Sequence, residues 1–328
     1  MVMSKETKTT PELRNLGKTK IKITPIGQGV MQFAGGTTFM KFMYPTLTDE
    51  QSNAIVKAAS DNGINWYDTA EAYGFGLSER KLALGLQAAN VKDEDVIIAT
   101  KWMPMMRRAE SIKKTIDKRI EHLSPYNIDL YQIHMPYSLS SFQKQFDSMA
   151  EILEAGHIRS IGISNFSAKQ MTKAHDILKE KDLVLASNQV NYSLIKRSIE
   201  SNGVLDAAKE LGVTIISWSP IQSGILSGKF HKDEEMYKNL PFARRMRSKK
   251  QIEESQELID TLDNIAKTHD STIAQIALNW LVNYHGKTVV AIPGATKASQ
   301  AESNGKAMSI KLTKNELKEI EEKSRLFL

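Results

Sequence analysis

The chain has 328 residues, of which 41% are hydrophobic and 25% are charged. This composition supports a large hydrophobic core and excludes an intrinsically disordered protein. The length fits either one α/β barrel or two ordinary domains. The net charge of +6 is small for this length, and the cations stand beside acids along helix-like segments. We therefore expect neither a nucleic-acid partner nor a membrane partner.

The absence of cysteine excludes disulfides, cysteine-based zinc sites and thiol nucleophiles. The seven histidines include no pair spaced four residues apart, so we expect no metal site. Residues 1–12 form a polar tail without the apolar core of a signal peptide, and no apolar stretch reaches membrane-spanning length. These features predict a soluble, cytoplasmic protein.

After the tail, residues 13–23 predict a short hairpin that turns at Gly17. Eight short apolar runs then alternate with segments that carry apolar residues at helical spacing. Strands buried on both faces of a parallel sheet require such consecutive apolar residues. The runs cover residues 25–31, 64–67, 96–100, 128–133, 160–164, 183–190, 213–218 and 289–293.

The segments between the runs carry helix signals. Several begin with a capping box, in which a side chain and the backbone satisfy each other's free N–H groups. Parallel strands need crossovers, so this alternation predicts a parallel sheet, and eight units predict closure. We predict a (β/α)8 TIM barrel over residues 13–328, with an N-terminal β-hairpin and an extra C-terminal helix. The expected caps are Thr48, Ser167, Thr272 and Thr313, and the expected helix stops are Gly63, Gly156 and Gly212.

Two further patterns refine this prediction. Neither GxGxxG after the first strand nor GxxxxGK[ST] occurs, which removes the Rossmann and P-loop fingerprints. The connection over residues 221–250 is too long for a simple turn, so it predicts a lid or a binding loop.

Polar residues stand where the predicted strands end, which is where such barrels carry their catalytic groups. A tyrosine with a reference pKa of about 10 is a weak acid unless a cation favours its ionised form. Lys101 can supply that cation to Tyr73, and Asp68 is the expected partner of a buried lysine. With His134 as a second hydrogen-bonding group, the set suits general acid catalysis at a carbonyl oxygen.

Seven sequence blocks resemble those of the aldo-keto reductase superfamily, in order and at the ends of the predicted strands. The resemblance spans roughly residues 13–307 and implies an NADPH-dependent reductase. In that case Tyr73 is the general acid, Lys101 lowers its pKa, Asp68 holds Lys101, and His134 orients the carbonyl. The blocks are GINWYDTAEAYGFGLSERKLALG, IATKW, DLYQIHMP, SIGISNF, QVNYS, SWSPIQSGILSGK and IPGATKASQAESN.

The same resemblance implies a site for the NADP cofactor. Many members have basic residues where this chain has Gly294 and Gln300, so the chain resembles the IPGA branch, shared with potassium-channel β subunits and with bacterial and plant reductases. This departure leaves NAD possible beside NADP. The implied cofactor residues are Ser164, Asn165, Gln189, Trp218, Ser219, Pro220, Ile221, Gln222, Ser223, Gly224, Leu226, Lys229, Gly294, Thr296, Lys297, Gln300 and Asn304.

A substrate pocket is expected from apolar residues that follow or border strand ends. Methionine and aromatic side chains suit a broad range of small carbonyl substrates. The expected lining is Met31, Phe33, Tyr44, Trp102 and Met103.

Two alternatives to a reductase stay open. A buried barrel lysine is also the nucleophile of Schiff-base lyases, although Asp68 and Tyr73 give Lys101 another role. The resemblance also includes channel β subunits, which would make the chain a cofactor-binding regulatory subunit with little turnover. We expect a monomer or a weak homo-oligomer.

Overall fold

Eight parallel strands form the centre of the computed structural model, which describes residues 11–37 and 45–328. Hydrogen bonds between Gly27 and Ala291 and between Gly29 and Pro293 join the first strand to the last, so the ring closes. All eight predicted runs are strands. In the order of the ring they are β3 (Gln28–Gly29), β4 (Trp66–Asp68), β5 (Ile97–Trp102), β6 (Leu130–Ile133), β7 (Ile161–Ser164), β8 (Leu185–Asn191), β9 (Thr214–Trp218) and β10 (Val289–Ile292).

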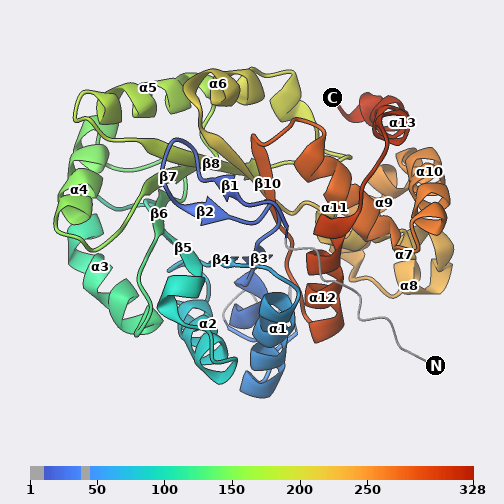
Figure 1. The fold of residues 1–328 in the computed structure, drawn as a ribbon, viewed down its shortest axis with the longest axis horizontal. Coiled ribbons are helices and arrows are strands. Elements are labelled where there is room, and N and C mark those ends of the chain that lie inside the picture. The colour runs from blue at the N-terminus through green and yellow to red at the C-terminus, as the bar shows by residue number, and fades with distance from the viewer. Residues whose placement is uncertain (1–10, 38–44) are drawn as a thin grey trace.

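The predicted hairpin is also present. Its strands β1 (Arg14–Asn15) and β2 (Lys22–Ile23) lie across the centre of the ring in Figure 1. Leu16 and Ile23 are buried in the apolar cluster that fills this end of the barrel. The hairpin therefore covers the end of the barrel from which the strands start.

Helices surround the ring (Figure 1). The four predicted capping boxes are confirmed, each with both of its hydrogen bonds. The helices are α1 (Asp49–Asp61), α2 (Leu77–Ala88), α3 (Glu110–Leu123), α4 (Phe142–Glu154), α5 (Ala168–Lys179), α6 (Val204–Leu211), α10 (Gln256–Thr268), α11 (Ile273–Asn283), α12 (Ala298–Lys306) and the C-terminal α13 (Lys314–Ser324).

The connection after β9, whose length predicts a lid or a binding loop, is largely helical. It contains a 3-10 segment (Gln222–Ser227), α7 (Lys229–Lys232), α8 (Glu234–Lys238) and α9 (Phe242–Glu254). Ile225, Leu226 and Phe230 are buried against the core, and Asp233 caps α8. Burial of these apolar side chains explains why the segment folds rather than staying open.

Two layers of side chains fill the barrel, because residues two apart on a strand face the same side. The layer near the hairpin is apolar and includes Trp66, Ala99 and Leu130. Two residues further along the same strands stand Asp68, Lys101 and Gln132, all buried. The strands therefore change from an apolar layer to a polar layer toward their carboxyl ends.

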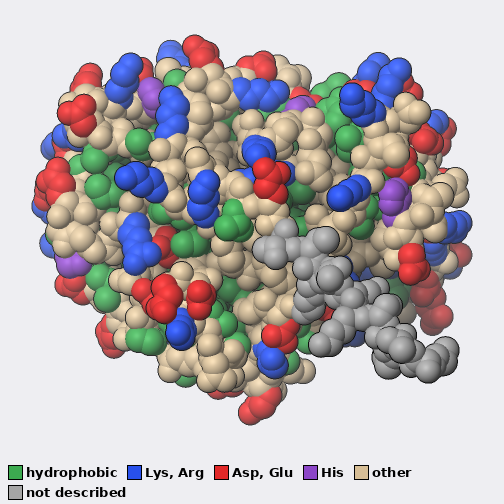
Figure 2. Space-filling model, in the orientation of Figure 1, with side chains coloured by type: hydrophobic (Ala, Val, Ile, Leu, Met, Phe, Trp, Pro, Cys, Tyr) green, Lys and Arg blue, Asp and Glu red, His purple; other side chains and the backbone are tan. Residues whose placement is uncertain are grey.

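The surface shows no field of a single charge on the face drawn in Figure 2, where Lys, Arg, Asp and Glu side chains are interspersed. Within residues 11–37 and 45–328, no helix combines the length and the apolar character needed to cross a bilayer.

Candidate active site

The polar layer is organised around one ion pair. Lys101 Nζ lies 2.5 Å from Asp68 Oδ1 and also donates to the Thr69 carbonyl oxygen at 2.8 Å. Both charged side chains are almost fully buried. Burial alone would lower the pKa of Lys101, but Asp68 and Tyr73 outweigh it and the pKa of Lys101 is raised. The lysine is therefore a fixed positive charge at neutral pH.

Two amides hold the other oxygen of Asp68. Gln189 Nε2 donates to Asp68 Oδ2 at 2.8 Å, and Gln132 Nε2 donates to the same oxygen at 3.1 Å. Gln132 stands opposite Lys101 in the β5–β6 register. These bonds stabilise an ionised carboxylate inside the barrel. The structure thus turns Gln189 toward Asp68, although the resemblance assigned it to a nicotinamide carboxamide.

Tyr73 lies on the connection between β4 and α2, where it is half-buried. The centroid of its ring is 5.1 Å from Lys101 Nζ. Burial raises the pKa of Tyr73, and the positive charge of Lys101 opposes this effect without reversing it. The expectation that Lys101 favours the ionised form is correct in direction, but the phenol stays protonated at neutral pH.

His134 follows β6 and faces Tyr73 edge-on, with ring centroids 5.8 Å apart. Burial lowers the pKa of His134 to about 3, and the charge of Lys101 contributes in the same direction. The imidazole is therefore neutral. Its Nδ1 atom is buried and has no hydrogen-bond partner among the residues that the structure describes. A neutral imidazole beside a protonated phenol can take part in hydrogen bonds to a carbonyl oxygen.

Asn165 links this centre to the next strands. It has a left-handed backbone with φ 64°, which asparagine tolerates better than most residues. Its Nδ2 donates to the His134 carbonyl oxygen at 3.1 Å, and its Oδ1 accepts from Trp218 Nε1 at 3.1 Å. The neighbouring Ser164 hydroxyl donates to the Gln189 carbonyl oxygen. The indole of Trp218 is thus fixed at the rim, close to the catalytic candidates.

The segment after β9 is a tight turn with a left-handed backbone. Ser219, Gln222, Ser223 and Gly224 all have positive φ values, between 42° and 91°. Within the turn the N–H groups of Gln222 and Gly224 donate to the carbonyl oxygens of Ser219 and Ile221. Lys229 Nζ would lie 3.1 Å from a Cβ on Gly224, so the ammonium group approaches the same turn. Among the cofactor residues expected in this segment, Pro220, Gly224 and Leu226 are buried, and Ile221 and Gln222 are half-buried.

The last part of the expected cofactor site lies on α12 and the turn before it. Lys297 is the exposed N-cap residue, and Gln300 Oε1 accepts from the Thr296 backbone N–H at 2.8 Å. Lys297, Gln300 and Asn304 follow helical spacing and share one face. Asn304 is 6% exposed, and its Nδ2 has no partner within the described part of the chain. Gly294, half-buried, lies against the amide of Gln32.

These residues fit a nicotinamide dinucleotide on the observations themselves. A glycine-containing turn with a nearby ammonium suits a pyrophosphate, and the unpartnered amide of Asn304 suits a polar ring edge. Trp218 offers an indole at the rim for a stacked ring.

The structure brings only part of the expected substrate lining to the rim. Met31 and Met103 are partly exposed. Phe33 and Trp102 are 1% and 0% exposed. The Trp102 indole, at the end of β5, donates to the hydroxyl of Ser111 on α3. Since Lys101 faces the interior, its neighbour Trp102 faces the helices. The fifth expected residue, Tyr44, lies outside the described residues.

Three further residues contribute to the site and were missed in the sequence. Gln132 stands two residues after the inward-facing Leu130, so strand alternation in the sequence already indicates that its side chain also faces the barrel interior. Glu71, two positions before Tyr73, forms a buried ion pair with Arg119 at 2.7 Å. Arg119 occupies the apolar face of α3 at helical spacing from Ile112 and Ile116, and a charge at such a position indicates a buried partner.

Comparisons with known proteins agree with this geometry. A family model described as Aldo/keto reductase family matches residues 25–325. Pyridoxal reductase, chloroplastic, of Arabidopsis thaliana is 31% identical over 320 residues, covering 92% of this chain and 85% of that protein. Aldo-keto reductase YhdN of Bacillus subtilis is 29% identical, covering 94% and 92%. A solved structure of the thermostable aldo-keto reductase Tm1743 superposes with a TM-score of 0.76 at 28% identity, covering 95% of this chain and 99% of that one.

Proposed function

Because the chain belongs to the aldo/keto reductase family of NAD(P)H-dependent oxidoreductases, we propose that it reduces aldehydes or ketones with Tyr73 as the general acid. The observation that carries this proposal is a protonated phenol 5.1 Å from a buried lysine charge, measured from ring centroid to Nζ. A proton donor beside a fixed cation is what an oxygen that gains negative charge requires.

In this mechanism the reduced nicotinamide, when bound, supplies hydride to the carbonyl carbon. Tyr73 donates its phenolic proton to the carbonyl oxygen. The positive charge of Lys101 stabilises the phenolate that remains, and Asp68 keeps Lys101 in place. The neutral His134 hydrogen-bonds the carbonyl oxygen and orients it. Because Lys101 and Asp68 are buried, their electrostatic interactions are stronger than they would be in water.

The residues proposed to hold the cofactor come from four strand ends and α12. Trp218 would stack on the nicotinamide, while Ser164, Asn165 and Gln189 would bind its carboxamide once Gln189 turns from Asp68. Residues 219–226 and Lys229 would hold the pyrophosphate. We propose that Lys297, with Thr296, Gln300 and Asn304, gives a preference for NADPH, since Lys297 adds a cation to the same helix face.

The charge state of Lys101 argues against a Schiff-base lyase. A Schiff-base lysine needs a neutral amine, which enzymes obtain by lowering the pKa. Here Asp68 raises the pKa of Lys101 instead. The reductase therefore explains the site better.

The substrate side supports a small carbonyl compound with an apolar group. The connections after β4, β5 and β6 expose Phe75, Met105, Met106 and Tyr137 by 66% or more each, near the partly exposed Met103. Such side chains adapt to apolar groups of different shape. Pyridoxal is a suitable first aromatic aldehyde, since one relative is named a pyridoxal reductase.

The test combines cofactor titration with turnover. Quenching of tryptophan fluorescence by NADPH and by NADH, measured separately, reports binding beside Trp218. Oxidation of NADPH is then followed with pyridoxal, benzaldehyde and straight-chain aldehydes. We expect tighter binding of NADPH than of NADH and aldehyde-dependent oxidation. Tight binding with turnover at background for every carbonyl would contradict the proposed reductase and favour a regulatory cofactor-binding protein.

A further inference from the structure

Glu71 extends the contact between β4 and β5 beyond the end of β4. The Thr69 N–H donates to the Ala99 carbonyl oxygen at 2.9 Å, and the Glu71 N–H donates to the Lys101 carbonyl oxygen at 3.3 Å. The next N–H on the β5 side, that of Met103, donates to Glu71 Oε1 at 2.6 Å. The carboxylate thus takes the place of the next backbone carbonyl in the ladder.

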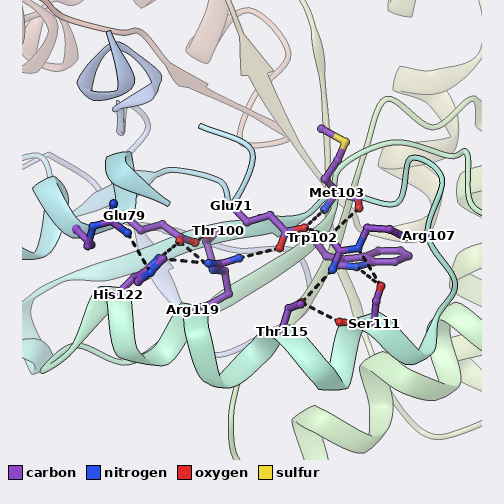
Figure 3. A network of polar contacts seen from close by, with 11 residues as sticks. Glu71, Glu79, Thr100, Trp102, Met103, Arg107, Ser111, Thr115, Arg119 and His122 are labelled. Carbon is purple, nitrogen blue, oxygen red and sulfur yellow. Dashed lines mark hydrogen bonds and ion pairs between the residues drawn. The ribbon is translucent and has the colours of Figure 1, made fainter. Parts of the chain in front are cut away.

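Two arginines complete the surroundings of this carboxylate. Arg119 Nη1 lies 2.7 Å from Glu71 Oε2, and Arg107 Nη1 contacts Oε1. Arg107 also donates to the Met103 carbonyl oxygen and to the hydroxyls of Ser111 and Thr115. Figure 3 shows Glu71 between the two guanidinium groups, with Arg119 reaching up from α3. One carboxylate therefore joins the connection after β4, the connection after β5, and α3.

The same network has a second carboxylate with a different role. Glu79 on α2 pairs with Arg119 Nε at 2.8 Å, contacts His122 and accepts from the Thr100 hydroxyl at 2.7 Å. Glu79 is as deeply buried as Glu71, with exposed fractions of 0% and 8%. Only Glu71 lies on the connection that carries Tyr73. The two carboxylates share Arg119 but fix different segments.

We infer that Glu71 is a positioning residue that holds the connection bearing Tyr73 against the strand bearing Lys101. Tyr73 stands two positions after Glu71 in the chain, and the backbone N–H of Glu71 donates to the carbonyl oxygen of Lys101 itself. The same carboxylate fixes the Met103–Arg107 segment at the substrate side. Loss of the carboxylate lets Tyr73 move relative to Lys101 while the rest of the barrel stays in place. This inference rests on the proposed role of Tyr73 as the acid.

The test uses Glu71→Gln and Glu71→Asp. Both carboxylate oxygens accept from donors, so the NH2 group of the amide faces either Met103 and Arg107 or Arg119 and loses the acceptor there. The shorter aspartate keeps the charge but withdraws it from Met103. We expect kcat to fall on the order of 10- to 100-fold in Glu71→Gln, because a displacement of about 1 Å has such effects. We expect the Kd for NADPH to change by less than about twofold, since Glu71 is not among the residues proposed to hold the cofactor. Glu71→Asp covers the case in which Glu71→Gln does not fold.

The pH dependence separates positioning from a loss of stability. When Tyr73 moves away from Lys101, its pKa rises, so the alkaline limb of kcat moves to higher pH. An ultraviolet titration of tyrosinate in the free protein, taken as the difference from Tyr73→Phe, reports the same shift without turnover. Glu79→Gln is the matched control, because it removes the other carboxylate from Arg119. We expect it to lower the thermal midpoint while leaving the alkaline limb unchanged.

Three results would overturn the inference. The first is an alkaline limb of kcat that stays unchanged in both Glu71 variants. The second is a kcat of Glu71→Gln within twofold of the parent enzyme. The third is the same shift of the alkaline limb in Glu79→Gln. If the parent protein itself turns over no carbonyl, the proposed function fails instead. The titration of Tyr73 in the free protein still decides the role of Glu71.

Discussion

Among the buried charges of the described residues, one cluster faces the rim of the barrel and another lies away from it. The first is Asp68–Lys101. The second joins Arg197, which precedes the 3-10 segment Ser198–Glu200, to Glu200 and to the C-terminal helix α13. Arg197 makes two parallel bonds to Glu200 at 2.7 Å and also donates to the Glu321 carbonyl oxygen. Arg197 is as buried as Lys101, with exposed fractions of 1% and 0%.

The clusters differ in what lies beside them. The Arg197 guanidinium stacks 5.2 Å from the centroid of the Trp280 ring, and its remaining donor bonds go to protein atoms such as the Ser324 hydroxyl. It is enclosed by the protein and ties α13 to the barrel. Lys101 instead lies beside the half-buried Tyr73 and the neutral His134. A buried ion pair by itself is therefore no indication of catalysis, whereas one beside a titratable group at the rim is.

The largest difference between the two clusters is expected in Lys101→Met. We expect kcat for carbonyl reduction to fall about 1000-fold, because the phenolate of Tyr73 loses its stabilising cation. The Kd for NADPH should change little, as measured by tryptophan fluorescence. A kcat within tenfold of the parent enzyme would show that the first cluster is as purely structural as the second.

The reciprocal change is Arg197→Met. We expect the free energy of unfolding to fall by about 3–5 kcal/mol, since Glu200 keeps a buried charge without its main partner. Urea denaturation followed by circular dichroism measures this loss. Steady-state kcat at a temperature where the variant stays folded should match the parent value. A large loss of kcat under those conditions would mean that the second cluster also serves the reaction.

A smaller effect is expected at the far end of the proposed cofactor site. Lys297→Met should raise the Kd for NADPH about tenfold, the size of one charge-assisted contact, and leave the Kd for NADH nearly unchanged. Lys306→Met, on the same helix but paired with Glu302, is the control. Equal weakening for both cofactors in Lys297→Met would remove this lysine from NADPH selection.

The smallest effect concerns pH. Because the pKa of His134 lies at about 3 and that of Tyr73 is raised, kcat should stay flat between about pH 5 and 8. It should fall only in the alkaline range, where the phenol loses its proton. A limb near pH 6.5, the ordinary value for histidine, would mean that His134 titrates during catalysis.

The same lowered pKa affects stability. Below about pH 6.5 the unfolded chain binds a proton at His134 that the folded protein rejects. Folding stability should therefore decline as the pH falls from about 6.5 toward 3, and His134→Gln should reduce this decline. Urea midpoints measured across this range test the sign. An equal decline in parent and variant would assign the acid sensitivity to other groups.

Much of the fold could be predicted because it depends on local patterns. The eight apolar runs and the four capping boxes are properties of neighbouring residues, and all are confirmed. The helices after β9 were missed, since the spacing of Ile225, Leu226 and Phe230 gives a weak signal beside the length of the segment. The connection's burial against the core decides its structure.

The site could be predicted in its residue types but not in its contacts. Strand ends placed Asp68, Tyr73, Lys101 and His134 at one rim, as the structure has them. The bond from Gln189 to Asp68 depends on the register of strands far apart in sequence. The net rise of the Tyr73 pKa depends on burial, which no motif reports. The alternation of side chains along a strand, applied from the inward-facing Lys101, would have predicted that Trp102 faces the helices and not the substrate pocket.

The proposed role of Tyr73 as the proton donor is tested by Tyr73→Phe. Phenylalanine keeps the ring beside Lys101 and His134 and removes only the proton donor. We expect kcat for aldehyde reduction to fall by at least about 1000-fold while the Kd for NADPH, measured by tryptophan fluorescence, stays within about twofold. A variant that binds NADPH and reduces aldehydes at the parent rate would show that Tyr73 is not the proton donor.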